Sequence, residues 1–242
     1  MKNDFKNILK KHAKSFYFAG LLLEKQTLND AAILYAFCRQ LDDAADNYDP
    51  DKSNELKNII QDYRQPISLN TVNQSFKKIQ IKYDLKQKFI DDLISGVSSD
   101  TSFKQPQNLQ ELLLYSYRVA GTVGALMTRV LGANHQNAER FAIDLGIGMQ
   151  LTNISRDIKE DSLNNRIYIP KDMLPNDCSL ENILNDRNKE CIFNATNQIL
   201  NIAEKYYQSG IDGIYFIPHK NRFSILVAAI LYNSIGSISL GI

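Results

Sequence analysis

The polar stretch that decides the fold reads Gln150-Leu-Thr-Asn153-Ile-Ser-Arg156-Asp157-Ile-Lys-Glu-Asp161. In a helix, Asn153, Asp157 and Asp161 recur at every fourth position and form one column, with Gln150 one turn earlier on nearly the same face. The column offers only oxygen ligands, which suit a hard cation such as Mg²⁺ that also binds substrate phosphates. Taken alone, however, such a column is more simply explained as the solvated acidic face of a surface helix.

Length and composition indicate one globular domain spanning residues 1–242. Hydrophobic residues make up 44% of the chain and charged residues 23%, which is enough for a core, and the net charge of +1 gives no reason to expect a nucleic-acid partner. The three cysteines, Cys38, Cys178 and Cys191, have no metal-binding spacing, and their odd number favours a reduced, cytoplasmic setting. The basic, amphipathic N-terminus is interpreted as a first helix, because no apolar segment of signal-peptide length follows it.

The positions of the prolines predict an all-α fold. No proline occurs within 1–49 or 107–169, and both stretches show helical spacing of apolar residues without sustained alternation. Asp91, Asp92 and Asp100 are interpreted as a helix surface and its last turn. The expected helices cover about residues 4–22, 27–49, 53–64, 71–100, 109–131, 135–161, 178–209 and 220–240.

The last twenty residues need separate treatment, because 223–242 contains no charged side chain. A segment of this length could span a bilayer. Asn233, together with several serines and glycines, dilutes its hydrophobicity, so a buried helix is the preferred interpretation. A tail that contacts a membrane is the alternative.

A second acidic column follows an apolar helix segment and reads Arg39-Gln-Leu-Asp42-Asp43-Ala-Ala-Asp46. Asp42 and Asp46 share a face, Arg39 lies one turn earlier on that face, and Asp43 points about 100° away. Carboxylates that continue a buried face are costly unless a cation neutralises them. The alternative is a helix end that emerges into solvent.

Two glycines, Gly121 and Gly124, lie in the middle of the apolar helix expected at 109–131. Each costs about 1 kcal/mol relative to alanine inside a helix, so some interaction should offset the cost. Close packing against another helix is one explanation. Space for a ligand beside the backbone is the other.

The two acidic columns, taken together, predict a reaction. If their helices pack antiparallel, the columns can face each other across a cavity lined by the helix at 109–131. Mg²⁺ ions held by the aspartates, and arginines that bind phosphate oxygens, would favour departure of diphosphate from an apolar substrate. A dry apolar pocket would then keep water away from the carbocation.

Three sequence blocks occur in order between about residues 10 and 235. The first joins His12-Ala-Lys14-Ser15-Phe16-Tyr17-Phe18 to Tyr35-Ala-Phe37-Cys38-Arg39 and the Asp42/Asp46 column, the second is Tyr117-Arg-Val-Ala-Gly121-Thr-Val-Gly124, and the third joins 150–161 to Arg166-Ile-Tyr168-Ile-Pro170. Together the blocks resemble the phytoene/squalene synthase family of head-to-head prenyl transferases. The second block is most similar to phytoene and dehydrosqualene synthases.

The resemblance implies an isoprenoid synthase fold with helices around a central cavity, and it implies roles for particular residues. The implied metal ligands are Asp42, Asp46, Asn153, Asp157 and Asp161. The implied catalytic residues are Asp42, Asp46, Asp157, Asp161, Arg39 and Tyr35. The implied substrate-binding residues are Lys14, Ser15, Phe16, Arg39, Gln150, Arg156, Arg166, Tyr168 and Tyr232. Aromatic rings such as those of Phe16 and Tyr35 could stabilise cations through their π faces.

The implied activity is Mg²⁺-dependent condensation of two prenyl diphosphates to phytoene through a cyclopropylcarbinyl diphosphate, with Mn²⁺ as a substitute ion. Gly20, one turn beyond Phe16, favours C20 geranylgeranyl diphosphate if it leaves room in the tunnel, although it could simply end the helix. One alternative is a dehydrosqualene or squalene synthase that uses C15 farnesyl diphosphate, the squalene type also needing NADPH. Another is a non-catalytic member of the family that binds or assembles proteins.

The end of the chain and its surroundings give two further expectations. Family members usually continue beyond the position of Ile242, so the domain is expected to be shortened at its C-terminus. The expected partners are prenyl diphosphates and no nucleic acid. The expected location is the cytoplasm, with peripheral contact to a membrane for release of a lipid product.

Overall fold

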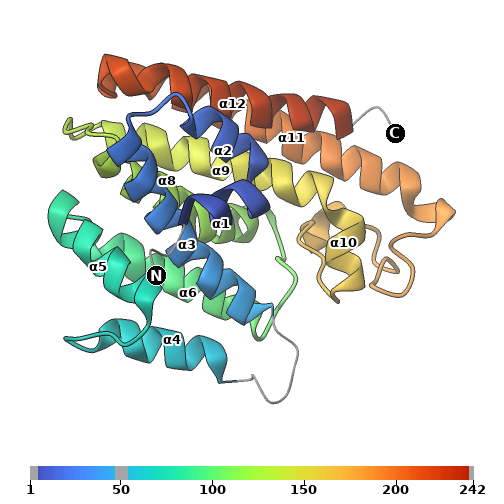
Figure 1. Cartoon of the computed structure of the whole chain (residues 1–242). Coiled ribbons are helices and arrows are strands. Elements are labelled where there is room, and N and C mark those ends of the chain that lie inside the picture. The colour runs from blue at the N-terminus through green and yellow to red at the C-terminus, as the bar shows by residue number, and fades with distance from the viewer. Residues whose placement is uncertain (1–4, 47–53, 240–242) are drawn as a thin grey trace.

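The computed structural model describes residues 5–46 and 54–239, and this part of the chain contains helices and no strand (Figure 1). The predicted all-α fold is therefore confirmed. The α-helices are α1 (Phe5–His12), α2 (Lys14–Gly20), α3 (Lys25–Ala45), α4 (Glu55–Arg64), α5 (Thr71–Tyr83), α6 (Gln87–Asp100), α7 (Leu109–Ser116), α8 (Thr122–Val130), α9 (Ala138–Arg156), α10 (Ile158–Leu163), α11 (Lys189–Asp212) and α12 (His219–Ser239). A π-helical segment, Tyr117–Gly121, joins α7 to α8, and short 3₁₀ segments cover Lys171–Met173, Asp186–Asn188 and Gly213–Phe216.

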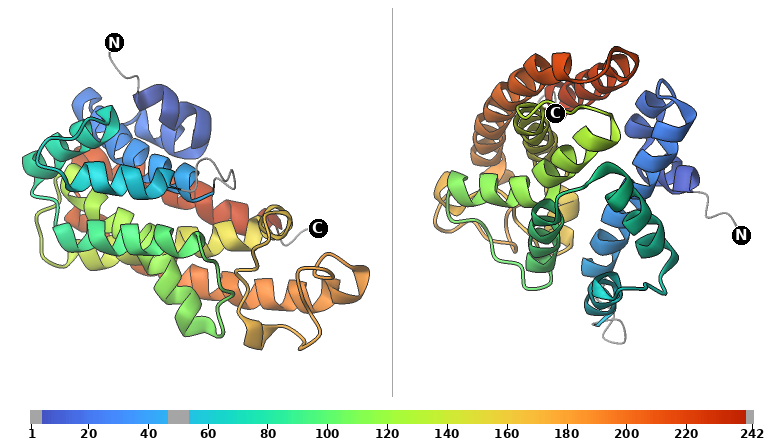
Figure 2. Two further views of the ribbon diagram at one scale, coloured as in Figure 1. Left: turned by 90° about the horizontal axis from the view of Figure 1, so that it is seen from below. Right: turned by 90° about the vertical axis from the view of Figure 1, so that its left-hand side faces the viewer.

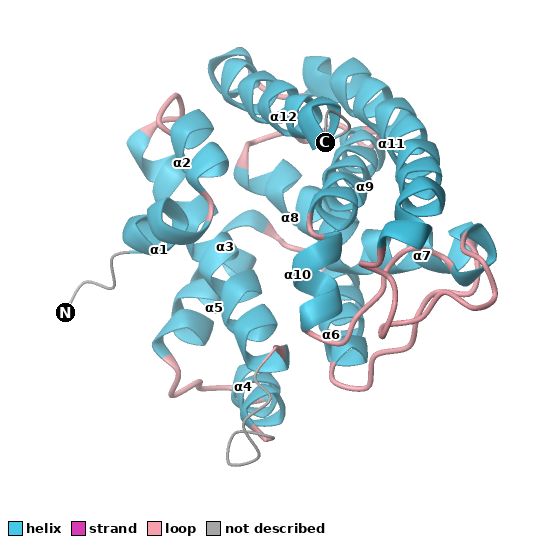
Figure 3. Ribbon diagram, turned by 90° about the vertical axis from the view of Figure 1, so that its right-hand side faces the viewer, coloured by secondary structure: helices cyan, strands magenta, loops and turns pink. Residues whose placement is uncertain are grey.

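The helices form two groups that meet along α8. In one group α9 packs against α8, α11 and α12, and in the other α3 packs against α1, α5, α6 and α8 (Figures 1 and 2). The short helix α2 packs against α1 and α12, so it bridges the two groups. Figure 3 shows α4 and α5 at the end of the molecule away from α12.

Several expected helices are interrupted or shortened. The first helix divides at Ala13, whose φ of −142° and ψ of 67° are not helical. The helix expected over 71–100 divides at Asp84, which takes the left-handed conformation (φ 50°) while the N–H of Leu85 bonds to the carbonyl of Gln80. The helix expected over 178–209 begins only at Lys189.

The glycines of α8 and α9 bring the two helix backbones together. A Cβ atom on Gly124 would lie 2.1 Å from the Ala142 carbonyl oxygen, and one on Gly146 would lie 2.4 Å from the Ala120 carbonyl oxygen. Neither distance leaves room for a methyl group. Close helix packing therefore accounts for Gly124, although this residue also lines the cavity described below.

Helix α12 buries only one of its faces, which corrects the expectation of a buried helix. Ala228 and Ala229 are 4% and 0% exposed, whereas Phe223 and Ile230 on the opposite face are 63% and 52% exposed. Within residues 5–46 and 54–239, no helix has the length and hydrophobicity needed to cross a bilayer.

Candidate active site

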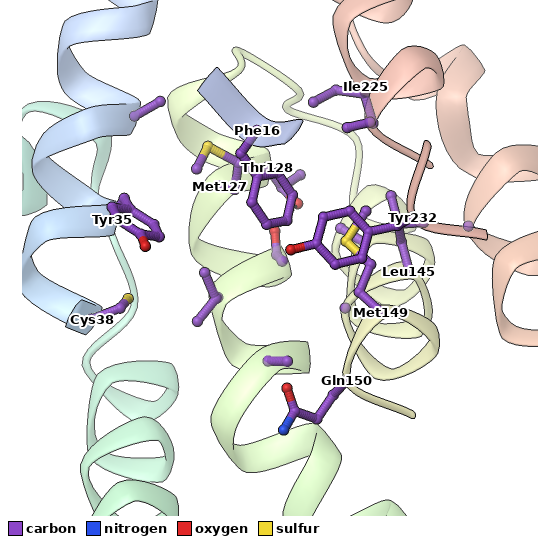
Figure 4. A pocket seen from close by; sticks show the side chains of 18 of the residues that line it. Phe16, Tyr35, Cys38, Met127, Thr128, Leu145, Met149, Gln150, Ile225 and Tyr232 are labelled. Atoms are coloured by element: carbon purple, nitrogen blue, oxygen red, sulfur yellow. Dashed lines mark hydrogen bonds between the residues drawn. The ribbon is translucent and has the colours of Figure 1, made fainter. Parts of the chain in front are cut away.

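A cavity of about 380 Å³ lies between the two helix groups. Its lining is mostly apolar and comes from α2, α3, α6, the Tyr117–Val130 region, α9, α11 and α12. Phe16 of α2 and Tyr232 of α12 project into it and stack, with ring centroids 4.7 Å apart (Figure 4). The predicted site residues that line this cavity are Phe16, Tyr35, Arg39, Asp42, Gln150, Asn153 and Tyr232.

The aspartate columns of α3 and of α9–α10 lie close together beside this cavity. Asp42 and Asn153 line it, whereas the other predicted metal ligands, Asp46, Asp157 and Asp161, are not part of its lining. Arg166 donates a hydrogen bond from Nη1 to Oδ1 of Asp46 at 2.5 Å, which ties the segment after α10 to the end of α3. The Asp46 carboxylate is also close enough to act electrostatically on both Asp42 and Asp161. The structure thus brings together two motifs that lie more than 100 residues apart in the sequence.

The second column bends at Asp157, where the sequence predicted a continuous helix. Helix α9 ends at Arg156, and Asp157 has φ −99° and ψ 16° before α10 begins. The N–H of Asp157 still bonds to the carbonyl of Asn153 (2.9 Å), and the N–H of Asp161 bonds to that of Asp157 (2.8 Å). Because the helical i to i+4 bonds continue through the bend, the three side chains keep their spacing of one turn.

Arginines engage most of the aspartates in these columns. Arg39 contacts Asp42 at 3.1 Å and Asp43 at 2.5 Å, so Asp43 is paired as well. Arg156 binds Asp157 through Nε (2.7 Å) and Nη2 (2.6 Å). Such charge-assisted contacts use the same carboxylate oxygens that would bind a cation.

Two of the column carboxyls have raised pKa values because they are buried next to other carboxylates. Burial, and then the charge of Asp46, raise the pKa of Asp42 to about 6 despite Arg39. Burial, and then the charge of Asp157, raise the pKa of Asp161 to about 7. A divalent cation would remove both the repulsion and the desolvation penalty of these carboxylates.

A family model described as Squalene/phytoene synthase matches residues 9–237 of the chain. The chain belongs to the squalene/phytoene synthase family. It is 29% identical to the 15-cis-phytoene synthase of Enterobacter agglomerans over 93% of this chain and 81% of that protein. It is 30% identical to the 15-cis-phytoene synthase of Paracoccus sp. over 93% of this chain and 77% of that protein.

Solved structures of the family have the same fold. A dehydrosqualene synthase bound to a ligand aligns with a TM-score of 0.85 at 27% identity, covering 95% of this chain and 82% of that one. The squalene synthase HpnC of Alicyclobacillus acidocaldarius aligns with a TM-score of 0.85 at 18% identity, covering 97% of this chain and 90% of that one. These alignments confirm the predicted isoprenoid synthase fold.

The residues present fit the Mg²⁺ ions that the family resemblance implies. The donors are all oxygens, and Oδ1 of Asn153 is buried without a hydrogen-bond partner among the described residues. An unpartnered buried amide oxygen is costly and would be satisfied by a cation. Across 5–46 and 54–239, no three His, Cys, Asp or Glu side chains converge as a ready metal site, since the arginines hold several of the aspartates.

Five of the predicted substrate-binding residues lie away from the cavity lining: Lys14, Ser15, Arg156, Arg166 and Tyr168. On α2, Lys14 is exposed and Ser15 is half-buried. Arg156 is exposed beside the bend at Asp157. Burial raises the pKa of the Tyr232 hydroxyl, and the positive charge of Arg156 nearby opposes this shift. Tyr168 is 8% exposed and donates a hydrogen bond to Asp100 at 3.2 Å. The roles of these residues in binding stay predictions.

Asp100, at the end of α6, was wrongly expected to be a surface residue. It lines the cavity and accepts hydrogen bonds from Tyr115 (3.0 Å) and Tyr168 (3.2 Å). Burial raises its pKa to about 6, although Arg166 opposes the shift. One sequence signal was available, because a carboxylate in the last turn of a helix opposes the helix dipole and needs a compensating interaction.

Cys38 also lies in the cavity wall, where it packs against the hydrophobic core (Figure 4). Burial raises the pKa of its thiol to about 12, so the side chain is neutral. Burial likewise raises the pKa of Tyr35 to about 12. Both side chains therefore present uncharged surface to whatever occupies the cavity.

Proposed function

We propose that this chain is a Mg²⁺-dependent prenyl transferase that joins two prenyl diphosphates head to head and forms phytoene. The observation that supports the proposal is the Arg166–Asp46 contact, which joins two oxygen-rich columns beside an apolar cavity that Asp42 and Asn153 line. An apolar cavity fits isoprenoid chains, and the columns fit the diphosphates of those chains. The relatives named as phytoene synthases support the same reaction.

The residues of this chain would divide the work as follows. Asp42, Asp46, Asn153, Asp157 and Asp161 would hold Mg²⁺, which when bound supplies positive charge to a departing diphosphate. Arg39, Arg156 and Arg166 would release their aspartates and bind phosphate oxygens. The Lys14 and Ser15 side chains would reach the same diphosphates, with Gln150 and Tyr168 orienting the ligands.

Formation of the bond proceeds in two stages. Diphosphate leaves C1 of one substrate, the alkene of the second substrate attacks the resulting allylic cation, and loss of a proton closes a cyclopropylcarbinyl diphosphate. Loss of the second diphosphate, rearrangement and loss of another proton then give phytoene. The rings of Phe16, Tyr35 and Tyr232 would stabilise the cations and, with the apolar walls, exclude water.

We infer that C20 geranylgeranyl diphosphate is the preferred substrate. Gly20 is the last residue of α2 and also lines the cavity. It therefore both ends the helix and borders the space for the substrate. A Cβ atom there would lie 2.9 Å from Cδ1 of Leu28, another lining residue, so a larger side chain would force Leu28 to move. The ligand-bound dehydrosqualene synthase favours a second candidate, C15 farnesyl diphosphate, with NADPH needed only for a squalene-type product.

Incubation of the protein with geranylgeranyl or farnesyl diphosphate tests the proposal. Each substrate is supplied with and without Mg²⁺, Mn²⁺ and NADPH, in detergent, and the products are identified by mass. A C40 product that requires metal and not NADPH is expected. Absence of any C30 or C40 product under all conditions would contradict the proposed enzyme activity and leave the assembly-factor alternative.

A further inference from the structure

One end of the cavity lies far from the aspartate columns. On α9, the residues that line the cavity lie at helical spacing, from Asn153 at the aspartate end to Phe141 and Ala138 at the other. A rise of 1.5 Å per residue places Phe141 roughly 18 Å along the helix from Asn153. Figure 4 shows Gln150 and Ile225 at opposite ends of the same cavity. A prenyl chain whose diphosphate lies beside the columns would therefore point its tail toward Phe141.

Phe141 is the innermost of three stacked rings at this end of the cavity. Its ring stacks on that of Phe216 with centroids 5.5 Å apart, and Phe216 stacks in turn on His135 at 4.3 Å. Phe141 lines the cavity, whereas Phe216 and His135 do not. His135 is exposed, so the three rings lead from the cavity to the surface of the molecule. Side chains therefore close this end, and the ring of Phe141 is the one that a ligand would meet.

The packing of α11 against α9 keeps Phe141 in its place. Gly213, directly after α11, also lines the cavity, and a Cβ atom on it would overlap the Cβ atom of Phe141. One turn earlier, a Cβ atom on Gly210 would lie 2.7 Å from Cβ of Leu145. The guanidinium of Arg140 lies 5.4 Å from the centre of the Phe141 ring, a distance at which a cation–π contact is favourable. Phe141 is therefore held by α11 and by its own helix.

The end wall of the cavity consists of four lining residues, Leu131, Phe141, Gly213 and Ile217. Hydrogen bonds fix the turns that carry two of them. Asn221 of α12 is 2% exposed and donates from Nδ2 to the Leu131 carbonyl at 2.9 Å. Arg222 donates to the carbonyls of Ile217 and Tyr215, each at 2.7 Å. Positions supported in this way stay in place when a ligand presses on them.

We propose that Phe141 sets the maximum length of the prenyl chain that the cavity accepts. This role rests on the proposed function, because it concerns the substrate of the same site. A chain that reaches the ring of Phe141 can bury no further carbon atoms unless Phe141 and Phe216 move. Relative to full burial, each methylene group left outside lowers the affinity about fourfold. Gly20 borders the cavity from α2, so Phe141 would limit chain length at a separate wall.

Binding of unreactive analogues tests this role without depending on turnover. The probes are thiolodiphosphates with C15, C20 and C25 prenyl chains, measured by calorimetry with Mg²⁺ in one detergent. Wild-type protein should bind the C20 analogue more tightly than the C15 analogue, and the C25 analogue no more tightly than the C20 analogue. Phe141→Ala should raise the ratio of C25 to C20 affinity at least about tenfold, because loss of the ring makes room for two or more methylene groups.

Three further variants make the result decisive. Phe193→Ala is the matched control and should keep the wild-type ratio, since Phe193 is 44% exposed on α11 and does not line the cavity. Phe141→Leu, a smaller change for use if Phe141→Ala does not fold, should shift the ratio in the same direction by less. Phe141→Ala/Phe216→Ala removes the second ring and should admit a C30 analogue. A Phe141 variant with a normal thermal melt and the wild-type ratio would overturn the proposal, as would wild-type protein that binds the C25 analogue most tightly.

Product analysis of the same proteins separates this role from the proposed function. Analogue binding with the expected dependence on length, but without any C40 product, would contradict the enzyme activity and support the role of Phe141. Formation of C40 product with the same length limit in wild type and Phe141→Ala would contradict the role of Phe141 alone. Failure of wild-type protein to bind any of the analogues would overturn both.

Discussion

The guanidinium of Arg166 lies 2.5 Å from the carboxylate of Asp46, although the two residues are 120 positions apart. Arg166 is 7% exposed, so solvent weakens this ion pair little on its side. A second guanidinium nitrogen, Nη2, donates to the backbone carbonyl of Asp100 at 3.4 Å. One arginine therefore connects the ends of α3 and α6 to the segment that follows α10.

Arg166→Lys should lower turnover by about 10- to 100-fold, because lysine lacks the forked guanidinium that contacts Asp46 and Asp100 here and that would bind phosphate oxygens in the reaction. The measurement is the steady-state rate of product formation at saturating Mg²⁺. Arg187→Lys is the matched control, since Arg187 is exposed and its ion pair with Asp177 spans 3.7 Å. Equal rates for both variants would show that Arg166 is dispensable for the reaction.

The second column should bind metal through its two carboxylates. Asp157→Asn and Asp161→Asn should each reduce product formation by about 100-fold or more, and should raise the Mg²⁺ concentration needed for half-maximal rate by about tenfold. Asp172→Asn, at an exposed position on a 3₁₀ segment, serves as the control. An unchanged Mg²⁺ titration in both column variants would rule out the metal assignment.

The sequence was sufficient to predict the columns, because helical spacing survives the bend at Asp157. It could not identify the partners of Asp100, because Tyr115 and Tyr168 are 15 and 68 residues away and become neighbours only through folding. Nor could periodicity alone divide the helix at Asp84, where a left-handed residue ends α5 without a proline or glycine. The sequence also could not show that Phe223 is exposed. A helix with two apolar faces does not indicate which of the two is buried.

The length of the product should respond to the side chain at position 20. Gly20→Leu should shift Leu28 into the cavity and raise the ratio of C30 to C40 product at equal substrate concentrations. Gly20→Ala, which adds one methyl group, should give an intermediate ratio. If Gly20→Leu has a normal thermal melt and the same ratio of C30 to C40 product as wild type, Gly20 does not select the length of the substrate.

Helix contact, rather than helix propensity, should determine the effect of changing Gly124. Alanine favours a helix over glycine by about 1 kcal/mol, so a propensity effect alone would stabilise Gly124→Ala. The 2.1 Å approach of the new Cβ to the Ala142 carbonyl oxygen should instead destabilise it by about 1–3 kcal/mol. Chemical denaturation measures the sign and the size of the change in the free energy of unfolding. Ser95→Ala, at an exposed position of α6, is the control.

The buried carboxylate of Asp30 should make stability depend on pH. Burial raises its pKa, but hydrogen bonds from Lys82 (2.6 Å), Tyr83 (2.7 Å) and Gln26 (2.9 Å) outweigh burial, and the pKa is lowered overall from 3.8. A carboxyl whose pKa is lower in the folded state contributes stability above its unfolded pKa, and the contribution disappears as pH falls through the folded value.

Asp30→Asn should therefore cost about 1–3 kcal/mol at neutral pH, because Lys82 and Tyr83 lose a charged acceptor that is 3% exposed. Urea denaturation from pH 7 down to pH 3 measures the difference between wild type and variant, which should shrink below about pH 4. Asp91→Asn is the control, since Asp91 is exposed and accepts a hydrogen bond from Gln87 on its own helix. A difference that stays constant across this range would assign the cost to lost packing and not to the charge of Asp30.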